Sequence, residues 1–162
     1  MIVYHGSVCK VRQPDISFSK SNLDFGRGFY VTSYRGQAER WAKRKAMRSR
    51  RSPILNIYEI ADDLDEYKVL NFPQINETWL DFVCSCRRGG DDYLAYDVIK
   101  GPVADDDVFQ CINFYYHGIW TKKRTLEEIR FARPNDQIAL ITQNVIESSL
   151  SFVESVILEE TP

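Results

Sequence analysis

Histidine and cysteine are scarce in this chain of 162 residues. The two histidines, His5 and His117, lie far in sequence from the lone Cys-x-Cys formed by Cys84 and Cys86, so no metal-ligand spacing is present. The same scarcity leaves no Ser-His-Asp or Cys-His set for nucleophilic catalysis that spacing supports. We therefore expect no metal site, and four reduced, mostly buried thiols as in a cytoplasmic protein.

Long apolar runs and a strong net charge are also missing. No run approaches the length of a membrane span, and Met1 leads straight into a predicted strand rather than into a signal peptide. The formal net charge is -2, so no global excess of charge demands nucleic acid or a membrane as partner. Hydrophobic residues make up 44% of the sequence and aromatic residues 13%. This composition argues against disorder and predicts one domain over residues 1–162.

A glycine-rich stretch, residues 23–32, organises the rest of the chain. Gly26 and Gly28 flank Arg27, and glycine is used where the backbone bends sharply or approaches a ligand closely. Phe29 and Tyr30 follow, and neighbouring side chains on a strand point to opposite faces. If Phe29 packs inward, Tyr30 faces a surface or cleft. Alone, the pattern is typical of a turn; a ligand site is the less common alternative, and the dinucleotide-binding fingerprint is absent because a strand follows.

Four ordered motifs extend this pattern over nearly the whole chain. They are Tyr4-His5-Gly6-Ser7, residues 23–32, residues 97–106 and Gln137-Ile138. In this order they resemble the DUF3990 family, a bacterial branch of the ADP-ribosyltransferase superfamily of the His-Tyr-Glu or His-Tyr-Gln type. The resemblance implies an enzyme that cleaves the nicotinamide-ribose bond of NAD, its substrate, and transfers ADP-ribose to an acceptor.

The same resemblance implies roles for individual residues. His5 is expected to bind the adenosine ribose, and the backbone of Gly6 to pair with the nicotinamide carboxamide. Ser7 assists through its hydroxyl, and the Tyr30 ring stacks on nicotinamide. Further candidates for NAD binding are Gly26, Gly28 and Thr32. Without the other motifs, we would interpret His5 as a strand-end histidine bonded to nearby backbone, and the alternative for Tyr30 is a half-exposed strand aromatic.

The resemblance implies a third position, which bonds the nicotinamide ribose and where many relatives carry glutamate; here it falls on Gln137. An amide donates and accepts hydrogen bonds, but it has no charge to stabilise a cation or to act as a base. Asp105 and Asp106 are candidates for the missing carboxylate if the helix that they begin faces the cleft. The alternative, which we favour for Asp105, is capping of that helix.

Apolar periodicity predicts strands and helices that do not strictly alternate. The expected strands are 2–5, 30–32, 54–60, 68–72, 96–101, 137–142 and 150–158. The expected helices begin near residues 33, 74, 105, 125 and 143, and Thr142 is expected to cap the last of them. The first helix is expected to bury Tyr34, Ala38, Trp41, Ala42 and Ala46 and to be capped by Thr32 or Ser33. This pattern predicts an α+β fold with split antiparallel sheets and flanking helices, as the ADP-ribosyltransferase resemblance also implies.

Basic residues crowd the end of the first predicted helix, between Arg40 and Arg51. We favour a solvated helix face with cations near the helix C-terminus; the alternative is a binding patch for phosphate, nucleic acid or an acidic partner. The acceptor of ADP-ribose, a protein or a nucleic acid, stays open. A glycohydrolase and a non-catalytic binding module on the same fold are competing functions. The resemblance further implies a bacterial toxin with a small antitoxin partner, and no membrane partner is expected.

Overall fold

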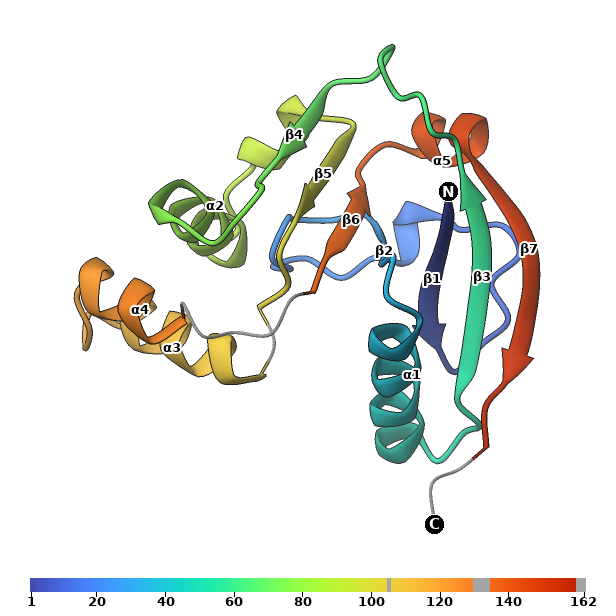
Figure 1. Cartoon of the computed structure of the whole chain (residues 1–162), viewed down its shortest axis with the longest axis horizontal. Coiled ribbons are helices and arrows are strands. Elements are labelled where there is room, and N and C mark those ends of the chain that lie inside the picture. The colour runs from blue at the N-terminus through green and yellow to red at the C-terminus, as the bar shows by residue number, and fades with distance from the viewer. Residues whose placement is uncertain (105, 130–134, 160–162) are drawn as a thin grey trace.

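Two open sheets with helices packed against them make up the fold (Figure 1). The computed structural model describes residues 1–104, 106–129 and 135–159. Within these ranges the chain forms five α-helices and seven strands, which is an α+β architecture and confirms the predicted fold class. The described residues contain no helix that is long and apolar enough to cross a membrane.

The first sheet is antiparallel and has the strand order β1-β3-β7. Its strands are β1 (Ile2–Ser7), β3 (Ile54–Ile60) and β7 (Leu150–Ile157). β3 is the central strand and is buried at five of its seven positions, as a run rich in isoleucine predicts. Helix α1 (Arg35–Ser49) packs against this sheet, close to β1 (Figure 1).

The second sheet has the strand order β2-β6-β5-β4. Its strands are β2 (Phe29–Val31), β6 (Gln137–Leu140), β5 (Val98–Gly101) and β4 (Val69–Asn71). The β2–β6 and β6–β5 pairs are antiparallel as predicted, whereas β4 and β5 run parallel, so this sheet is mixed. Helix α2 (Glu77–Arg87) lies between β4 and β5 in the chain. It returns the chain to the end of the sheet at which β4 begins, as a connection between parallel strands requires.

A short backbone bridge ties the two sheets together. The Tyr4 amide donates to the Thr32 carbonyl at 2.8 Å, and the Thr32 amide donates to the Tyr4 carbonyl at 3.0 Å. The bridge lies one residue before His5 on β1 and directly after β2. It therefore brings the His-Gly-Ser strand end beside the strand that carries Tyr30.

Helix α1 differs from its prediction in its cap and in its buried face. It begins at Arg35 after Tyr34, whose side chain makes no capping hydrogen bond, so Thr32 and Ser33 are not its N-cap. Only the alanines of the expected face are buried, whereas Tyr34 and Trp41 are 47% and 51% exposed. The close approach of β1 to this helix leaves room for methyl groups but not for large rings. The buried alanines are Ala38, Ala42 and Ala46.

The remaining helices largely follow their sequence signals. α2 is capped by the Asn76 side chain, and α5 (Gln143–Ser149) by Thr142 as predicted. α3 (Asp106–Tyr116) ends before Gly118, which adopts a φ of +71°. α4 (Lys122–Ile129) begins three residues earlier than expected, and Thr121 accepts a hydrogen bond from the Arg124 amide. α2, α3 and α4 lie together on one side of the molecule, whereas α5 lies beside β7 (Figure 1).

Candidate functional site

His5 is held in one tautomer at the bridge between the sheets. Its Nδ1 lies 2.7 Å from the Tyr30 carbonyl oxygen, and because a carbonyl only accepts, Nδ1 must carry the proton. The ring stacks on Phe29, with 4.6 Å between the ring centroids. Burial, followed by the positive charge of Lys45, lowers the pKa of His5 to about 4, against the raising effect of the Tyr30 carbonyl. At neutral pH the imidazole is uncharged, and Nε2 is a hydrogen-bond acceptor.

Gly6 allows helix α1 to lie directly against β1. A Cβ at this position would stand 2.1 Å from the Ala38 carbonyl oxygen, which no ordinary side chain tolerates. The Gly6 carbonyl accepts a hydrogen bond from Lys45 Nζ at 3.0 Å and keeps a second lone pair. Burial and the nearby charge of Lys20 lower the pKa of Lys45 to about 8. Ser7 is buried, and its hydroxyl accepts from the Cys9 amide at 3.3 Å.

Tyr30 lies on the face of β2 opposite to the buried Phe29, as strand alternation predicts. Its side chain is half-buried rather than fully turned to solvent, because it also packs against the core around Phe25. The hydroxyl donates to the Gly26 carbonyl at 2.6 Å and accepts from the Phe25 amide at 3.0 Å. Burial, followed by the negative charge of Asp24, raises the pKa of Tyr30 well above its ordinary value. The tyrosine thus fixes the glycine turn that precedes it.

Gln137 opens β6, as predicted, and its side chain is buried. Its Nε2 donates to the Asp24 carboxylate at 3.3 Å and to the Pro102 carbonyl at 3.2 Å. Both partners of Nε2 are acceptors, so the amide is oriented with nitrogen toward them and with Oε1 away from them.

Asp24, which accepts a hydrogen bond from Gln137, also forms an ion pair with Arg87. This ion pair was not predicted from the sequence. Arg87 Nη2 and Nε lie 2.6 and 2.8 Å from Asp24 Oδ1, and the two side chains are only 13% and 14% exposed. The Arg87 guanidinium also stacks on the Phe109 ring at 4.6 Å. Its Nη1 is buried and has no hydrogen-bond partner among the described residues.

The sequence offered only a weak signal for this pair. Asp24 belongs to the glycine-rich stretch, but Arg87 ends a helix to which no chemistry was assigned. The pair bridges 63 residues of chain, so no local spacing could reveal it.

The structure brings His5, Tyr30 and Gln137 into one connected set. Tyr30 is paired with Ala139 across β2 and β6, and Gln137, two residues away on β6, lies on the same face. His5 donates a hydrogen bond to the Tyr30 carbonyl, and Gln137 donates one to the Asp24 carboxylate. The negative charge of Asp24 contributes to the raised pKa of Tyr30.

The other residues predicted to bind NAD have clear packing roles. Gly26 has a φ of +77°, and a Cβ there would overlap the Tyr93 ring at 2.3 Å. A Cβ on Gly28 would meet the Leu140 carbonyl oxygen at 2.7 Å. Thr32 donates from its hydroxyl to Asp136 at 2.6 Å and accepts from the Tyr34 amide. These contacts explain the residue types without a ligand, and NAD binding by these three residues stays a prediction.

The two carboxylates that were candidates for the missing charge are not placed by the structure. Asp105 lies outside the described residues. Asp106 is the first residue of α3, but its side chain is also outside the described part, so its predicted role stays a prediction.

Two other features of the described residues lie apart from this set. All four cysteines are free thiols, and no group of three or more His, Cys, Asp or Glu side chains in the described ranges could hold a metal ion. A shallow hollow between α2 and α3 contains none of the predicted site residues. Its lining is Asp81, Cys84, Ser85, Arg88, Gly89, Gly90 and Tyr115.

Comparison with known families decides the relationship of the chain. Residues 1–152 match the model of a family described as a protein of unknown function, DUF3990. The chain belongs to the DUF3990 family. This confirms the family that the ordered motifs indicated. The match spans His5, Tyr30 and Gln137, so the connected set lies within the DUF3990 region. A comparison with curated proteins found no match.

Proposed function

We propose that this DUF3990 protein is an NAD-dependent ADP-ribosyltransferase of the His-Tyr-Gln type and that DUF3990 is a branch of that superfamily. One observation carries the proposal: three distant segments come together, because His5 bonds to the Tyr30 backbone at 2.7 Å and Gln137 lies on the face of the sheet that carries the Tyr30 side chain. The motif pattern assigns these three residues to the binding of NAD, and residues that bind one ligand must lie together.

The donors and acceptors present suit NAD. His5 Nε2 is an uncharged acceptor for a ribose hydroxyl, because Nδ1 is committed to the Tyr30 carbonyl. The second lone pair of the Gly6 carbonyl accepts from the nicotinamide carboxamide. Stacking on nicotinamide needs only the ring face of Tyr30, so it is compatible with the hydrogen bonds that the hydroxyl already makes.

Cleavage of the nicotinamide-ribose bond requires little proton transfer from the protein. The bond electrons leave with nicotinamide, which becomes neutral, so no strong general acid is needed. The ribose carbon then carries positive charge, as in glycoside cleavage, until an acceptor nucleophile attacks it and loses its proton. The protein contributes by holding the ring, the ribose and the acceptor in reacting geometry.

Gln137 acts in this scheme through its orientation. Asp24 and the Pro102 carbonyl hold Nε2, which leaves Oε1 to accept a hydrogen bond from the nicotinamide ribose. Asp24 is a positioning residue rather than a catalytic one, because Arg87 neutralises its charge. The cation is stabilised by oriented dipoles instead of a free carboxylate.

Nicotinamide release by the purified protein tests the proposal. We expect release from NAD by the native chain, either alone or when cell extract supplies an acceptor, and a loss of at least tenfold in His5→Ala and Tyr30→Ala. Tyr30→Phe keeps the ring and should retain nicotinamide binding. Val153→Ala, at an exposed position of β7, is the matched control and should behave as the native chain.

The pattern of release separates the alternatives. Release that needs extract indicates a transferase, and release without extract indicates a glycohydrolase or transfer to the chain itself. The proposal fails if the folded protein releases no nicotinamide with or without extract, and NAD binding without release would indicate a non-catalytic binding module on the same fold. The toxin role is part of the same proposal: expression of the native chain should arrest bacterial growth, and Tyr30→Ala should not.

A further inference from the structure

Positive charge is concentrated in one seventeen-residue segment of an otherwise acidic chain. Residues 35–51 contain eight arginines and lysines and a single acid, Glu39. The segment therefore carries +7, whereas the whole chain carries -2, which leaves -9 for the rest. Glu39 pairs with Arg35 at 2.8 Å, at the start of α1. From Arg40 onward every charged residue of the segment is basic. Segregation on this scale marks a dedicated surface rather than an average helix face.

Packing turns most of these cations outward. α1 buries only its three alanines, so the rest of its circumference is free to carry charge. Arg40, Arg44 and Arg48 are exposed, and so are Arg50 and Arg51 at the helix end. Five of the seven basic residues from position 40 onward are arginines. Arginine is the side chain that best matches phosphate oxygens, through its planar fork of donors.

Exposed apolar side chains are interleaved with the cations. Trp41 is 51% exposed and Met47 is 83% exposed, although both occur in a helix that packs on a sheet. Lys45 Nζ lies 5.6 Å from the centre of the Trp41 ring. A large ring that is left outside the core beside a cation, on a helix rich in arginine, is an arrangement on which nucleic-acid bases stack.

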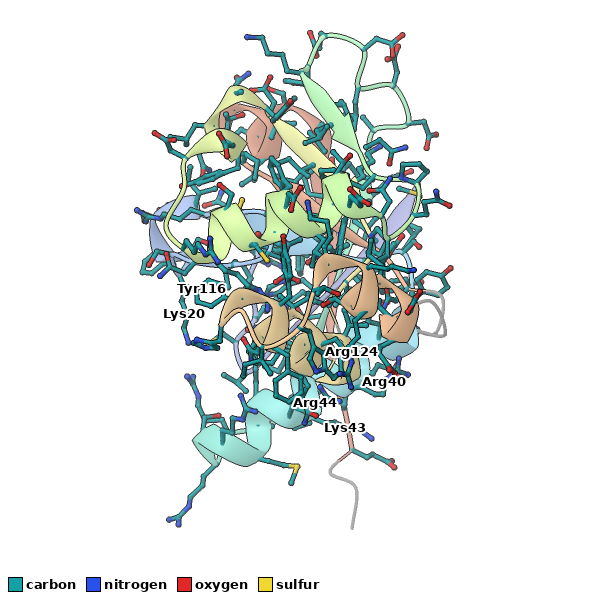
Figure 2. All side chains as sticks on the ribbon, turned by 90° about the vertical axis from the view of Figure 1, so that its left-hand side faces the viewer. Lys20, Arg40, Lys43, Arg44, Tyr116 and Arg124 are labelled. Atoms are coloured by element: carbon teal, nitrogen blue, oxygen red, sulfur yellow. The ribbon has the colours of Figure 1, made fainter. Side chains whose placement is uncertain are left out.

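The same face receives cations and aromatic rings from other elements. Figure 2 shows Lys20 from the loop before β2, Arg40 from α1, Tyr116 from α3 and Arg124 from α4 on one side of the molecule, together with Lys43 and Arg44. The Arg124 guanidinium lies 4.5 Å from the Trp120 ring centre, and the Arg88 guanidinium 4.6 Å from that of Tyr116.

We infer that this face binds single-stranded nucleic acid, with α1 contacting the phosphates and Trp41 stacking on a base. An acidic peptide would use the positive charge but not the exposed ring, so a polynucleotide fits the whole surface better. Lys45 connects the face to the candidate site, because its Nζ lies 3.0 Å from the Gly6 carbonyl. If the proposed transferase function holds, on which this last step rests, the nucleic acid is the ADP-ribose acceptor.

Fluorescence anisotropy tests the binding without NAD. The probes are a labelled 20-nucleotide single strand of mixed sequence as RNA and as DNA, the matching duplex, and a labelled polyglutamate peptide of similar charge. We expect at least one single strand to bind, with a slope of about -3 for log affinity against log salt, as for four or five phosphate contacts. Duplex and polyglutamate should bind more weakly, because neither offers an unstacked base to Trp41.

Two matched triple variants locate the surface. Arg40→Gln/Arg44→Gln/Arg48→Gln should weaken binding by at least tenfold and reduce the salt slope by about 2. Lys10→Gln/Arg12→Gln/Lys68→Gln removes three exposed cations elsewhere and should change affinity by less than threefold. Trp41→Ala should weaken binding of the single strand by about tenfold. Thermal unfolding shows that each variant is folded.

Several outcomes would overturn the inference. They are no binding at 50 mM salt, polyglutamate bound as tightly as the single strands, equal losses in the two triple variants, or no effect of Trp41→Ala. The acceptor step is tested by transfer of label from NAD to the bound oligonucleotide, which the α1 triple variant should lose while it still binds NAD. Absence of nicotinamide release in every variant would defeat the transferase proposal and leave the binding result standing.

Discussion

The Gln137 amide is held by the Asp24 carboxylate, with 3.3 Å between Nε2 and Oδ2. The contact joins the first residue of β6 to the glycine-rich turn before β2. It explains why an amide suits this position. A carboxylate at residue 137 would face two acceptors, Asp24 and the Pro102 carbonyl, and no donor.

Gln137→Glu is therefore expected to destabilise the fold at neutral pH. The new carboxylate would lie beside two other acceptors, Asp24 and the Pro102 carbonyl, which should lower the free energy of unfolding by about 1–3 kcal/mol. Because a protonated carboxyl can donate, part of this loss should return at pH 5. Urea unfolding at pH 7.5 and pH 5 measures the effect, with Gln137→Met as the variant that lacks the hydrogen bonds but adds no charge. Equal stability of Gln137→Glu and the native chain at pH 7.5 would contradict this reading.

The Asp24–Arg87 pair should behave as one energetic unit. Removing one partner leaves a buried charge uncompensated, so Asp24→Asn and Arg87→Gln should each lower the free energy of unfolding by about 3 kcal/mol or more. The double variant should lose clearly less than the two single losses added together, with a coupling of about 1–3 kcal/mol. Additive losses in a double-mutant cycle would show that the two side chains do not interact.

His5 should make the protein less stable as the pH falls from about 6.5 to about 4. In this window the unfolded chain binds a proton that the folded chain excludes, because the folded pKa is lowered to about 4. The full shift corresponds to about 3 kcal/mol at most. His5→Asn cannot titrate, so its free energy of unfolding should fall less than that of the native chain between pH 7 and pH 4.5. His117→Asn, at an exposed position, is the matched control. Parallel profiles for His5→Asn and the native chain would refute the assignment.

Two glycines near α1 should respond oppositely to alanine. Gly6→Ala would place Cβ 2.1 Å from the Ala38 carbonyl oxygen, so the helix must move away from β1, at a cost of about 1–3 kcal/mol. Gly36→Ala meets nothing closer than 3.5 Å, the tip of the Arg40 side chain, and lies inside the helix. It should stabilise by about 0.5–1 kcal/mol. Thermal unfolding of both variants measures the difference, and a neutral Gly6→Ala would mean that β1 and α1 are not in close contact.

Local patterns predicted most of the elements. Alternation correctly predicted that Phe29 and Tyr30 lie on opposite faces, and Thr142 was correctly identified as a helix cap. The failures involve distant partners. The parallel pairing of β4 and β5 depends on where α2 returns the chain, and the exposure of Trp41 depends on how closely β1 approaches α1.

The sequence by itself determined the family, the elements and the residue types of the candidate site, because short-range periodicity and ordered motifs encode them. Tertiary structure decided which groups support that site. Asp24 meets Arg87 across 63 residues of chain and Gln137 across 113. Lys45 reaches Gly6 across 39 residues and lowers the pKa of His5. Such contacts depend on the distance between side chains in space, and that distance is set only when the two sheets and their helices pack together.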